Sequence, residues 1–139
     1  MRIVLDSNRL FSALIKESIT RKIILEYDGY FLFPSYIFYE LEKHKDELLK
    51  KSKMEEPDFD MLLQILLKKV LIVPEQTLDE YKKEAIGIVK DIDLDDAVFI
   101  ACALAFPNSV IWSEDKKLKK QDKVKIINTF EMIAYLEEI

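Results

Sequence analysis

Five short segments of the chain carry apolar residues at almost every position, without the alternation of a strand that faces water on one side. Each segment is rich in the β-branched and aromatic residues that strands favour. Continuous apolarity predicts strands covered on both faces, as in a parallel sheet between layers of helices. The five segments are Ile3–Asp6, Tyr30–Phe33, Val70–Val73, Val110–Trp112 and Lys125–Ile127.

The segments between these strands carry apolar residues at the spacing of helices. Asp96–Phe106 is apolar on nearly all sides and stops before Pro107, so we predict that it forms the central buried helix. Thr77 and Glu80 have the spacing of a capping box, which predicts a helix start. The other predicted helices are Thr20–Tyr27, which follows a first loop, Tyr36 to about Lys51, Asp58–Lys69, Thr77–Lys90, and a last helix that starts at Asn128 and Glu131 and ends at Leu136.

Strands that alternate with helices predict a doubly wound α/β domain. The 139 residues fit one domain, residues 1–139, which can bury a core without disulfides. The single cysteine, Cys102, is predicted to be a reduced thiol packed as a small hydrophobic side chain. We find no targeting segment and no apolar run of the roughly 18 residues needed to span a bilayer, so we expect a soluble, cytoplasmic protein without membrane association.

Acidic residues stand where the predicted strands and helices meet one edge of the sheet. Asp6 ends the first strand, and Asp115 lies two residues beyond Ser113, which closes the fourth. The helix before a parallel strand runs antiparallel to it, so Asp96 at the start of the central helix lies at the same edge. Glu40 lies about one turn into the helix that leaves the second strand. Because ligands bind beyond the carboxyl ends of parallel strands, we expect these four carboxylates to converge there.

Clustered carboxylates repel one another unless a cation lies between them. Oxygen ligands are those preferred by Mg²⁺ or Mn²⁺, whereas zinc is disfavoured because the chain has one histidine, His44, and one cysteine. The reaction class that follows is metal-assisted hydrolysis of a phosphodiester.

Each acid also has an ordinary structural interpretation, and for a residue taken alone that interpretation is the stronger one. The joint placement of the acids at one edge is what favours a functional site. The ordinary roles are a turn residue for Asp6, a first helical turn after the capping Asp95 for Asp96, a solvated helix face for Glu40, and the start of the helical turn Lys116–Gln121 for Asp115.

The net charge of −5, from 21 Lys+Arg against 26 Asp+Glu, is unfavourable for binding nucleic acid through phosphate neutralisation alone. Lysines nevertheless follow Glu40 and Asp115, where they could hold phosphates on either side of the acids or could lie on solvated helix faces. Tyr36 and Tyr39 could stack bases or belong to the core, and His44 could act as a base or be structural. The lysines are Lys43, Lys45, Lys50, Lys51 and Lys53, and then Lys116, Lys117, Lys119, Lys120 and Lys123.

Four segments of the chain, in order, resemble the motifs of PIN (PilT N-terminal) domains. Ile3–Asn8 resembles the opening strand and turn, in which an Asp, a small hydroxyl residue and an Asn follow one another. Pro34–Leu41 is similar to the segment with a helical Glu, and Asp93–Leu104 to the acidic cluster before an Ala-rich buried helix. Val110–Leu118 resembles the segment in which a Ser or Thr precedes the last Asp. The resemblance covers nearly the whole chain apart from Lys50–Lys69.

The resemblance implies a three-layer α/β/α sandwich around a parallel five-stranded sheet. It also implies an endoribonuclease that uses Mg²⁺ or Mn²⁺ to hydrolyse phosphodiester bonds of single-stranded RNA. Members are often the toxin of a VapBC-type toxin–antitoxin pair, so a small antitoxin protein and a second copy of the chain are implied partners.

The resemblance also assigns roles residue by residue. Asn8 and Ser113 would orient the carboxylates, as groups around a metal site commonly do. Glu114 departs from the small polar residue common at its position, and Arg9 stands where an apolar residue is usual. The implied metal ligands are Asp6, Glu40, Asp96 and Asp115, with Asp93 as an additional or alternative ligand; Lys43, Lys116 and Lys117 are candidate substrate contacts, and Arg9 could contact a phosphate or an adjoining acid.

Two other classes of function are weighed against this one. A catalytically inactive PIN fold that acts as a binding or assembly module is favoured by Glu114 and by the negative net charge. A phosphotransfer domain is disfavoured, because the third strand ends in Val73–Glu75 without a phosphoacceptor aspartate and Asp6–Asn8 lacks the second aspartate of a phosphatase loop.

Overall fold

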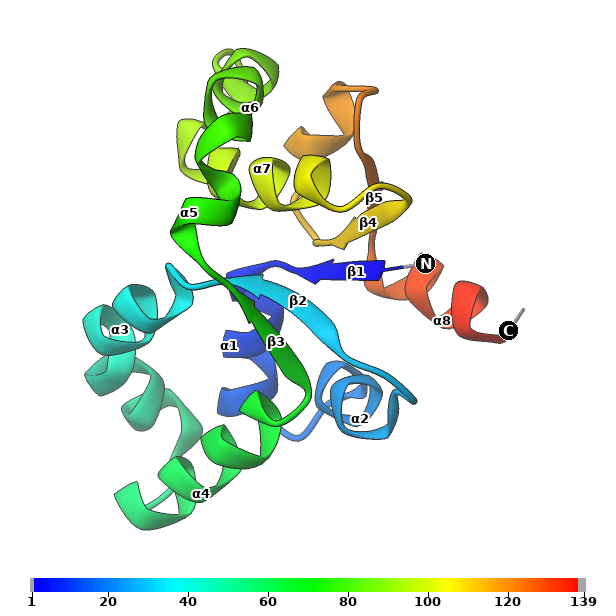
Figure 1. Cartoon of the computed structure of the whole chain (residues 1–139). Coiled ribbons are helices and arrows are strands. Elements are labelled where there is room, and N and C mark those ends of the chain that lie inside the picture. The colour runs from blue at the N-terminus through cyan, green and yellow to red at the C-terminus, as the bar shows by residue number, and fades with distance from the viewer. Residues whose placement is uncertain (1, 138–139) are drawn as a thin grey trace.

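The computed structural model describes residues 2–137, in which five strands form one sheet of order β3-β2-β1-β4-β5 (Figure 1). Every pair of neighbouring strands is parallel. The strand order reverses between β1 and β4, because β1 pairs on its other side with the strand that follows it in the chain. The strands are β1 (Arg2–Leu5), β2 (Phe31–Pro34), β3 (Val70–Val73), β4 (Ser109–Trp112) and β5 (Lys125–Ile127).

Helices cover both faces of the sheet, so the expected three-layer α/β/α sandwich is confirmed. Helices α1 to α4 lie on one face and α5 to α7 on the other, while α8 packs beside β5 (Figure 1). The helices are α1 (Ser7–Ile15), α2 (Ile19–Glu26), α3 (Ile37–Ser52), α4 (Glu56–Leu67), α5 (Glu75–Leu78), α6 (Lys82–Val89), α7 (Ala97–Ala105) and α8 (Thr129–Glu137), with 3₁₀ turns η1 (Asp79–Tyr81), η2 (Leu94–Asp96) and η3 (Lys116–Lys120).

The strands lie within one residue of their predicted positions, but two helix predictions were wrong. The segment predicted as a first loop forms α1, whose buried Leu10, Ala13 and Leu14 have helical spacing. The predicted helix Thr77–Lys90 is divided by η1, and Thr77 lies inside α5 rather than at a cap.

The start of α8 is as predicted. The backbone N–H of Glu131 donates to Asn128 Oδ1 at 2.8 Å, and the N–H of Asn128 donates to Glu131 Oε1 at 3.1 Å. These reciprocal bonds satisfy backbone donors that the first turn of the helix leaves free.

The core is built on the two strands that carry the first and fourth predicted motifs. Ile3, Val4 and Leu5 of β1 are fully buried, as is Trp112 at the end of β4. Helix α7 lies against the sheet beneath α6, and Cys102 on it is buried and unpaired, in agreement with its predicted packing. Burial raises the pKa of the Cys102 thiol to about 12, so it is inert at neutral pH.

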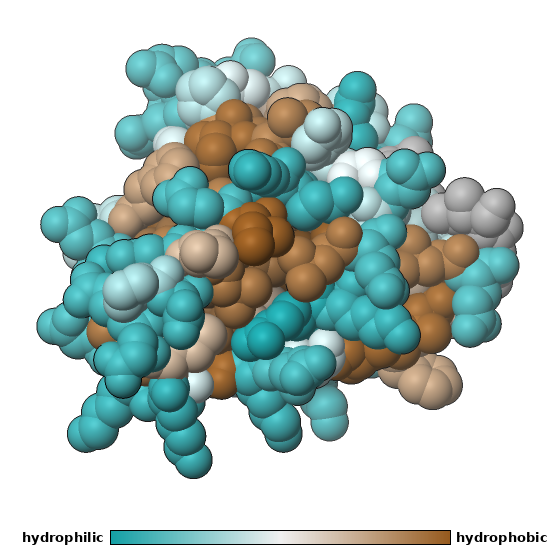
Figure 2. All heavy atoms as spheres, turned by 90° about the horizontal axis from the view of Figure 1, so that it is seen from below, coloured by the Kyte–Doolittle hydropathy of each residue, from teal (hydrophilic) through white to brown (hydrophobic). Residues whose placement is uncertain are grey.

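Seen from the side of α2, α3 and α4, the surface shows apolar patches between polar margins (Figure 2). Exposed apolar side chains on these helices include Ile19, Leu25, Met61 and Ile65. Among the helices of residues 2–137, none combines the length and the apolar character that crossing a bilayer requires.

Candidate metal centre

The site forms where β1 and β4 end side by side. Asp6 follows β1, and Ser113 and Asp115 follow β4, so all three lie at the carboxyl edge of neighbouring parallel strands. This is also the point at which strand order reverses, where open α/β sheets bind their ligands.

A hydrogen-bonded chain fixes these residues relative to one another. The Ser113 hydroxyl donates to Asp6 Oδ2 at 2.6 Å, and the backbone N–H of Asp115 donates to Ser113 Oγ at 3.1 Å. Asp6 stands at the N-cap position of α1, yet its side chain makes no capping bond there. Its carboxylate is therefore held by Ser113 and is aimed at the edge of the sheet.

A second pair of acids reaches the same place from the loop before α7. One carboxylate oxygen from each of Asp93, Asp96 and Asp115 lies within 4.8 Å of the others. Asp93 Oδ1 accepts from the N–H of Asp95 at 3.0 Å, so Asp93, rather than the expected Asp95, caps this turn. Asp115 Oδ1 accepts from the N–H of Lys117 at 2.9 Å, which confirms its capping role beside its place in the cluster.

The carboxylate of Asp96 is the least satisfied group of the cluster. Its Oδ2 atom is buried and, among residues 2–137, has no hydrogen-bond partner. Burial, and then the negative charges of Asp6, Asp93 and Asp115, raise the pKa of Asp96 to about 7. Burial also raises the pKa of Asp6, against the opposing hydrogen bond from Ser113. The cluster therefore holds its negative charge at a cost in free energy that a cation would relieve.

The donor set fits a hard divalent cation. It consists of carboxylate oxygens, which Mg²⁺ and Mn²⁺ prefer, and it includes one buried oxygen that has no hydrogen-bond partner in the described part of the chain. Cys102 lies in the core, and the ring of His44 packs edge-on against Phe11 at 5.7 Å between centroids. Neither of the soft ligands therefore belongs to the cluster.

Glu40 is held by a hydrogen bond at the start of α1. The Ser7 hydroxyl donates to Glu40 Oε1 at 2.5 Å, which links α3 to the residue that directly follows Asp6. Glu40 is not one of the three acids with mutually close oxygens. The structure thus brings together Asp93, Asp96 and Asp115 beside Asp6. Glu40 lies outside this group and is hydrogen-bonded to Ser7, the neighbour of Asp6 in the chain.

Comparison with protein families decides which known group has this arrangement. The profile described as PIN domain matches residues 4–137, almost the full chain. The chain belongs to the PIN domain family. Members of this family are generally nucleases, and they generally use divalent metals. Comparison with curated protein sequences gave no match.

Two solved structures have the same fold as this PIN domain. One is the crystal structure of VapBC2 from Rickettsia felis bound to a DNA fragment from their promoter, with 18% identity, a TM-score of 0.68, and coverage of 92% of this chain and 98% of that chain. The other is PAE2754 from Pyrobaculum aerophilum, with 14% identity, a TM-score of 0.69, and coverage of 100% of this chain and 91% of that chain. At these identities the likeness concerns the fold.

The two residues at which this PIN domain departs from the usual motifs lie together. Arg9 Nη1 is 3.9 Å from Glu114 Oε1, and the same Glu114 oxygen accepts from the N–H of Thr129 at 2.6 Å. Arg9 Nη1 also approaches Thr20 Oγ1 and Thr129 Oγ1, at 3.4 and 3.5 Å. Its side chain is 13% exposed, and its contact with Glu114 is of the kind predicted for it with an adjoining acid.

The predicted substrate lysines of the PIN domain lie on exposed helix surfaces. Lys116 and Lys117 start η3 directly after Asp115, and Lys43 lies on α3. Other lysines are occupied by ion pairs. Lys45 pairs with Glu56 and Asp60, Lys51 with Glu47, and Lys119 with Glu131.

The two residues that follow Asp6 in this PIN domain, Ser7 and Asn8, differ from the sequence-based expectation in opposite ways. Ser7 is the link between Glu40 and the strand end, and its only signal was the small hydroxyl residue of the first motif. Asn8, predicted to orient the carboxylates, is exposed and lines a groove with Glu40 and His44 between α1 and α3. Asn8 and Ser113 were both predicted to orient the carboxylates. Of the two, Ser113 is the one whose side chain hydrogen-bonds a carboxylate of the site, that of Asp6.

Replacement of Ser113 by alanine should destabilise the protein and distort the cluster. The buried Asp6 carboxylate would lose a charge-assisted hydrogen bond, at a cost of about 1.5–3 kcal/mol. Urea denaturation at pH 7 would measure this loss. Ser109→Ala is the matched control, because its hydroxyl donates to a neutral carbonyl, Ala103 O, at the other end of β4. A loss for Ser113→Ala no larger than that for Ser109→Ala would contradict the prediction.

Proposed function

We propose that this PIN domain is an endoribonuclease that uses Mg²⁺ or Mn²⁺ to hydrolyse phosphodiester bonds in single-stranded RNA. The observation that carries the proposal is the meeting of Asp93, Asp96 and Asp115, whose oxygens lie within 4.8 Å of one another at the switch point of the sheet. Asp96 Oδ2 supports it, because this buried oxygen has no hydrogen-bond partner among the residues that the structure describes and is suited to a cation.

Acids from three parts of the chain would hold the metal. Bound there, a divalent cation would favour ionisation of the attacking water and would offset the negative charge of the phosphodiester. The proposed ligands are Asp6, Glu40, Asp96 and Asp115, with Asp93 as an additional ligand.

Other residues of the chain would orient the metal-binding carboxylates or contact the RNA. Ser113 orients Asp6, and Ser7 orients Glu40, through the hydrogen bonds described above. Lys116 and Lys117, beside Asp115, would contact phosphates that flank the bond to be cut, and Lys43 would do so from α3. Arg9 lowers the pKa of Asp6, against the larger effect of burial, while it remains paired with Glu114.

We further propose that this chain is the toxin of a toxin–antitoxin pair, with a small antitoxin protein as its partner, and that it forms a homodimer. The fold that it shares with a chain of the VapBC2 complex supports this assignment. The acidic edge would attract a basic side chain of such a partner, which would compete with the metal and the RNA.

Cleavage of labelled single-stranded RNA tests the nuclease assignment. The wild type should cut RNA with Mn²⁺ or Mg²⁺, should be inactive with a chelator, and should regain activity when the metal is restored. Asp6→Asn should be inactive at every metal concentration, whereas Asp91→Asn, which changes an exposed acid two residues before Asp93, should remain active. Cleavage that is equal in wild type and Asp6→Asn would reject the mechanism. Absence of cleavage by a folded wild type would favour the inactive binding module.

A further inference from the structure

Two exposed tyrosines lie side by side at the start of α3. Tyr36 is 43% exposed and Tyr39 is 58% exposed, although large aromatic side chains are mostly buried. Their rings stack, with 5.4 Å between centroids and 30° between planes. The core position that the sequence offered as an alternative is therefore wrong for both residues.

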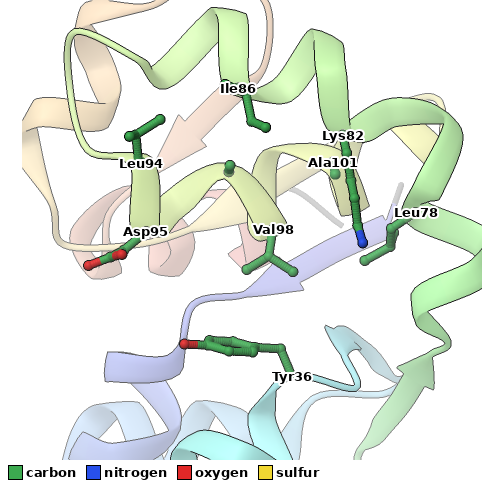
Figure 3. Close-up of a pocket in the computed structure, with 9 residues that line it drawn as sticks. Tyr36, Leu78, Lys82, Ile86, Leu94, Asp95, Val98 and Ala101 are labelled. Carbon is green, nitrogen blue, oxygen red and sulfur yellow. The ribbon is translucent and has the colours of Figure 1, made fainter.

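The tyrosine pair borders the acidic edge. Tyr36 is the N-cap residue of α3, and Tyr39 directly precedes Glu40 in its first turn. Partial burial raises the pKa of the Tyr36 hydroxyl, and the nearby carboxylates of Glu40 and Asp95 raise it further. In Figure 3, Tyr36 lies across an opening from Asp95 of η2 and Val98 of α7, which stand on either side of Asp96 in the sequence.

The surface beside the two rings is hollowed. Both tyrosines line a pocket of about 430 Å³, a volume within the range of small-ligand sites, together with Val98 and Leu78. A second hollow of about 280 Å³ extends from Tyr36 along α7 to Leu94 and Ile86. Lys43 lies 6.0 Å from the centroid of the Tyr39 ring, so a positive charge flanks the pair.

We propose that Tyr36 and Tyr39 form a stacking platform that holds a base of single-stranded RNA next to the bond to be cut. This inference rests on the proposed nuclease function. An aromatic face next to a lysine binds single-stranded nucleic acid by stacking on a base while the cation contacts the backbone. RNA fits better than a protein partner, because the platform adjoins the carboxylates proposed to act on the phosphodiester.

The platform can be removed without disturbing the helix that carries it. Tyr36 serves α3 through its backbone, since its carbonyl oxygen accepts from the N–H of Glu40 at 3.2 Å. The hydrogen bond from Ser7 to Glu40 involves neither tyrosine. Alanine at both positions should therefore leave the fold and the acidic cluster in place.

The test compares RNA binding and cleavage by the Tyr36→Ala/Tyr39→Ala double variant with those of the wild type. With Mn²⁺, we expect KM for single-stranded RNA to rise about 10-fold while kcat changes little, because stacking contributes to binding before and during the reaction. Binding of uncut RNA to Asp96→Asn, measured by fluorescence anisotropy, should weaken by the same factor when both tyrosines are removed.

Three controls make the result specific to stacking. Tyr36→Phe/Tyr39→Phe keeps both ring faces and should behave as the wild type does. Tyr30→Ala removes an equally exposed tyrosine, 58%, before β2 and should have no effect. An oligonucleotide that lacks its bases should bind the alanine and phenylalanine variants equally.

The outcomes separate the two proposals. A wild type that cuts RNA while the double alanine variant retains its KM would overturn the platform and leave the nuclease assignment intact. An equal loss of binding to RNA with and without bases would also overturn stacking, as would a loss of protein-partner binding alone. A folded wild type that cuts no RNA would instead remove the function on which the inference rests.

Discussion

Asp96→Asn should abolish metal-dependent cleavage, with a loss of at least about 100-fold in kcat, while the metal-free protein becomes more stable. The variant would keep the shape of the side chain but would lose the charge proposed to bind the metal. The same charge destabilises the metal-free fold, because it lies half-buried among the charges of Asp6, Asp93 and Asp115. Cleavage assays and thermal melts with a chelator at pH 8 would measure the two opposite effects.

The stability effect of Asp96 should depend on pH in a defined direction. The carboxyl group loses its proton near pH 3.8 in the unfolded chain but near pH 7 in the folded protein. Between these values the folded state binds more protons, so the wild-type free energy of unfolding should fall as the pH rises from about 4 to 7. The Asp96→Asn variant should lack most of this fall. A variant that loses activity but is less stable than the wild type at pH 8 would contradict this account of the cluster.

Trp112→Ala should be the most destabilising of the changes considered. Trp112 is fully buried, its ring packs against Phe31 at 5.9 Å between centroids, and its Nε1 donates to Thr129 Oγ1 at 3.1 Å. Removal of the indole should cost about 3–5 kcal/mol, a large part of the ~5–15 kcal/mol that stabilises a typical domain. Thermal or urea denaturation, followed by circular dichroism, would measure the loss.

Phe130→Ala is the matched control for this change, because its aromatic ring is 82% exposed and lies one residue after Thr129. It should alter the free energy of unfolding by no more than ~0.5 kcal/mol. Similar losses for the two variants would show that Trp112 does not anchor β4 in the way that its burial indicates.

The sheet was predictable because its signal is strong and local. Val70–Val73 is a continuous apolar run, Lys125–Ile127 has two β-branched residues after one lysine, and the structure has both strands at the predicted bounds. Helix α1 was missed because Asp6–Asn8 consists of residues that favour turns, although the spacing of Leu10, Ala13 and Leu14 carried a helical signal. The η1 break in the helix predicted over Thr77–Lys90 had no comparable signal.

The closeness of Asp96 and Asp115 was predictable from the sequence. It follows from the rule that ligands bind beyond the carboxyl ends of parallel strands, which needs no side-chain detail. The position of Glu40 is different, because it depends on how α3 is turned relative to β1, and a contact with Ser7 decides it. The pairing of Arg9 with Glu114 could not be derived once α1 had been taken for a loop. Such contacts are set by packing between elements, which a single sequence specifies only indirectly.

The order in which the chain is made has a consequence for the acidic edge. Ser113 bonds to Asp6 across 107 positions of sequence, and β4 must insert beside β1 before that bond can form. A nascent chain that has left the ribosome only as far as α6 holds Asp6 and Glu40 but lacks Asp96 and Asp115. The acidic edge is therefore incomplete until the residues up to Asp115 have emerged and β4 has paired with β1.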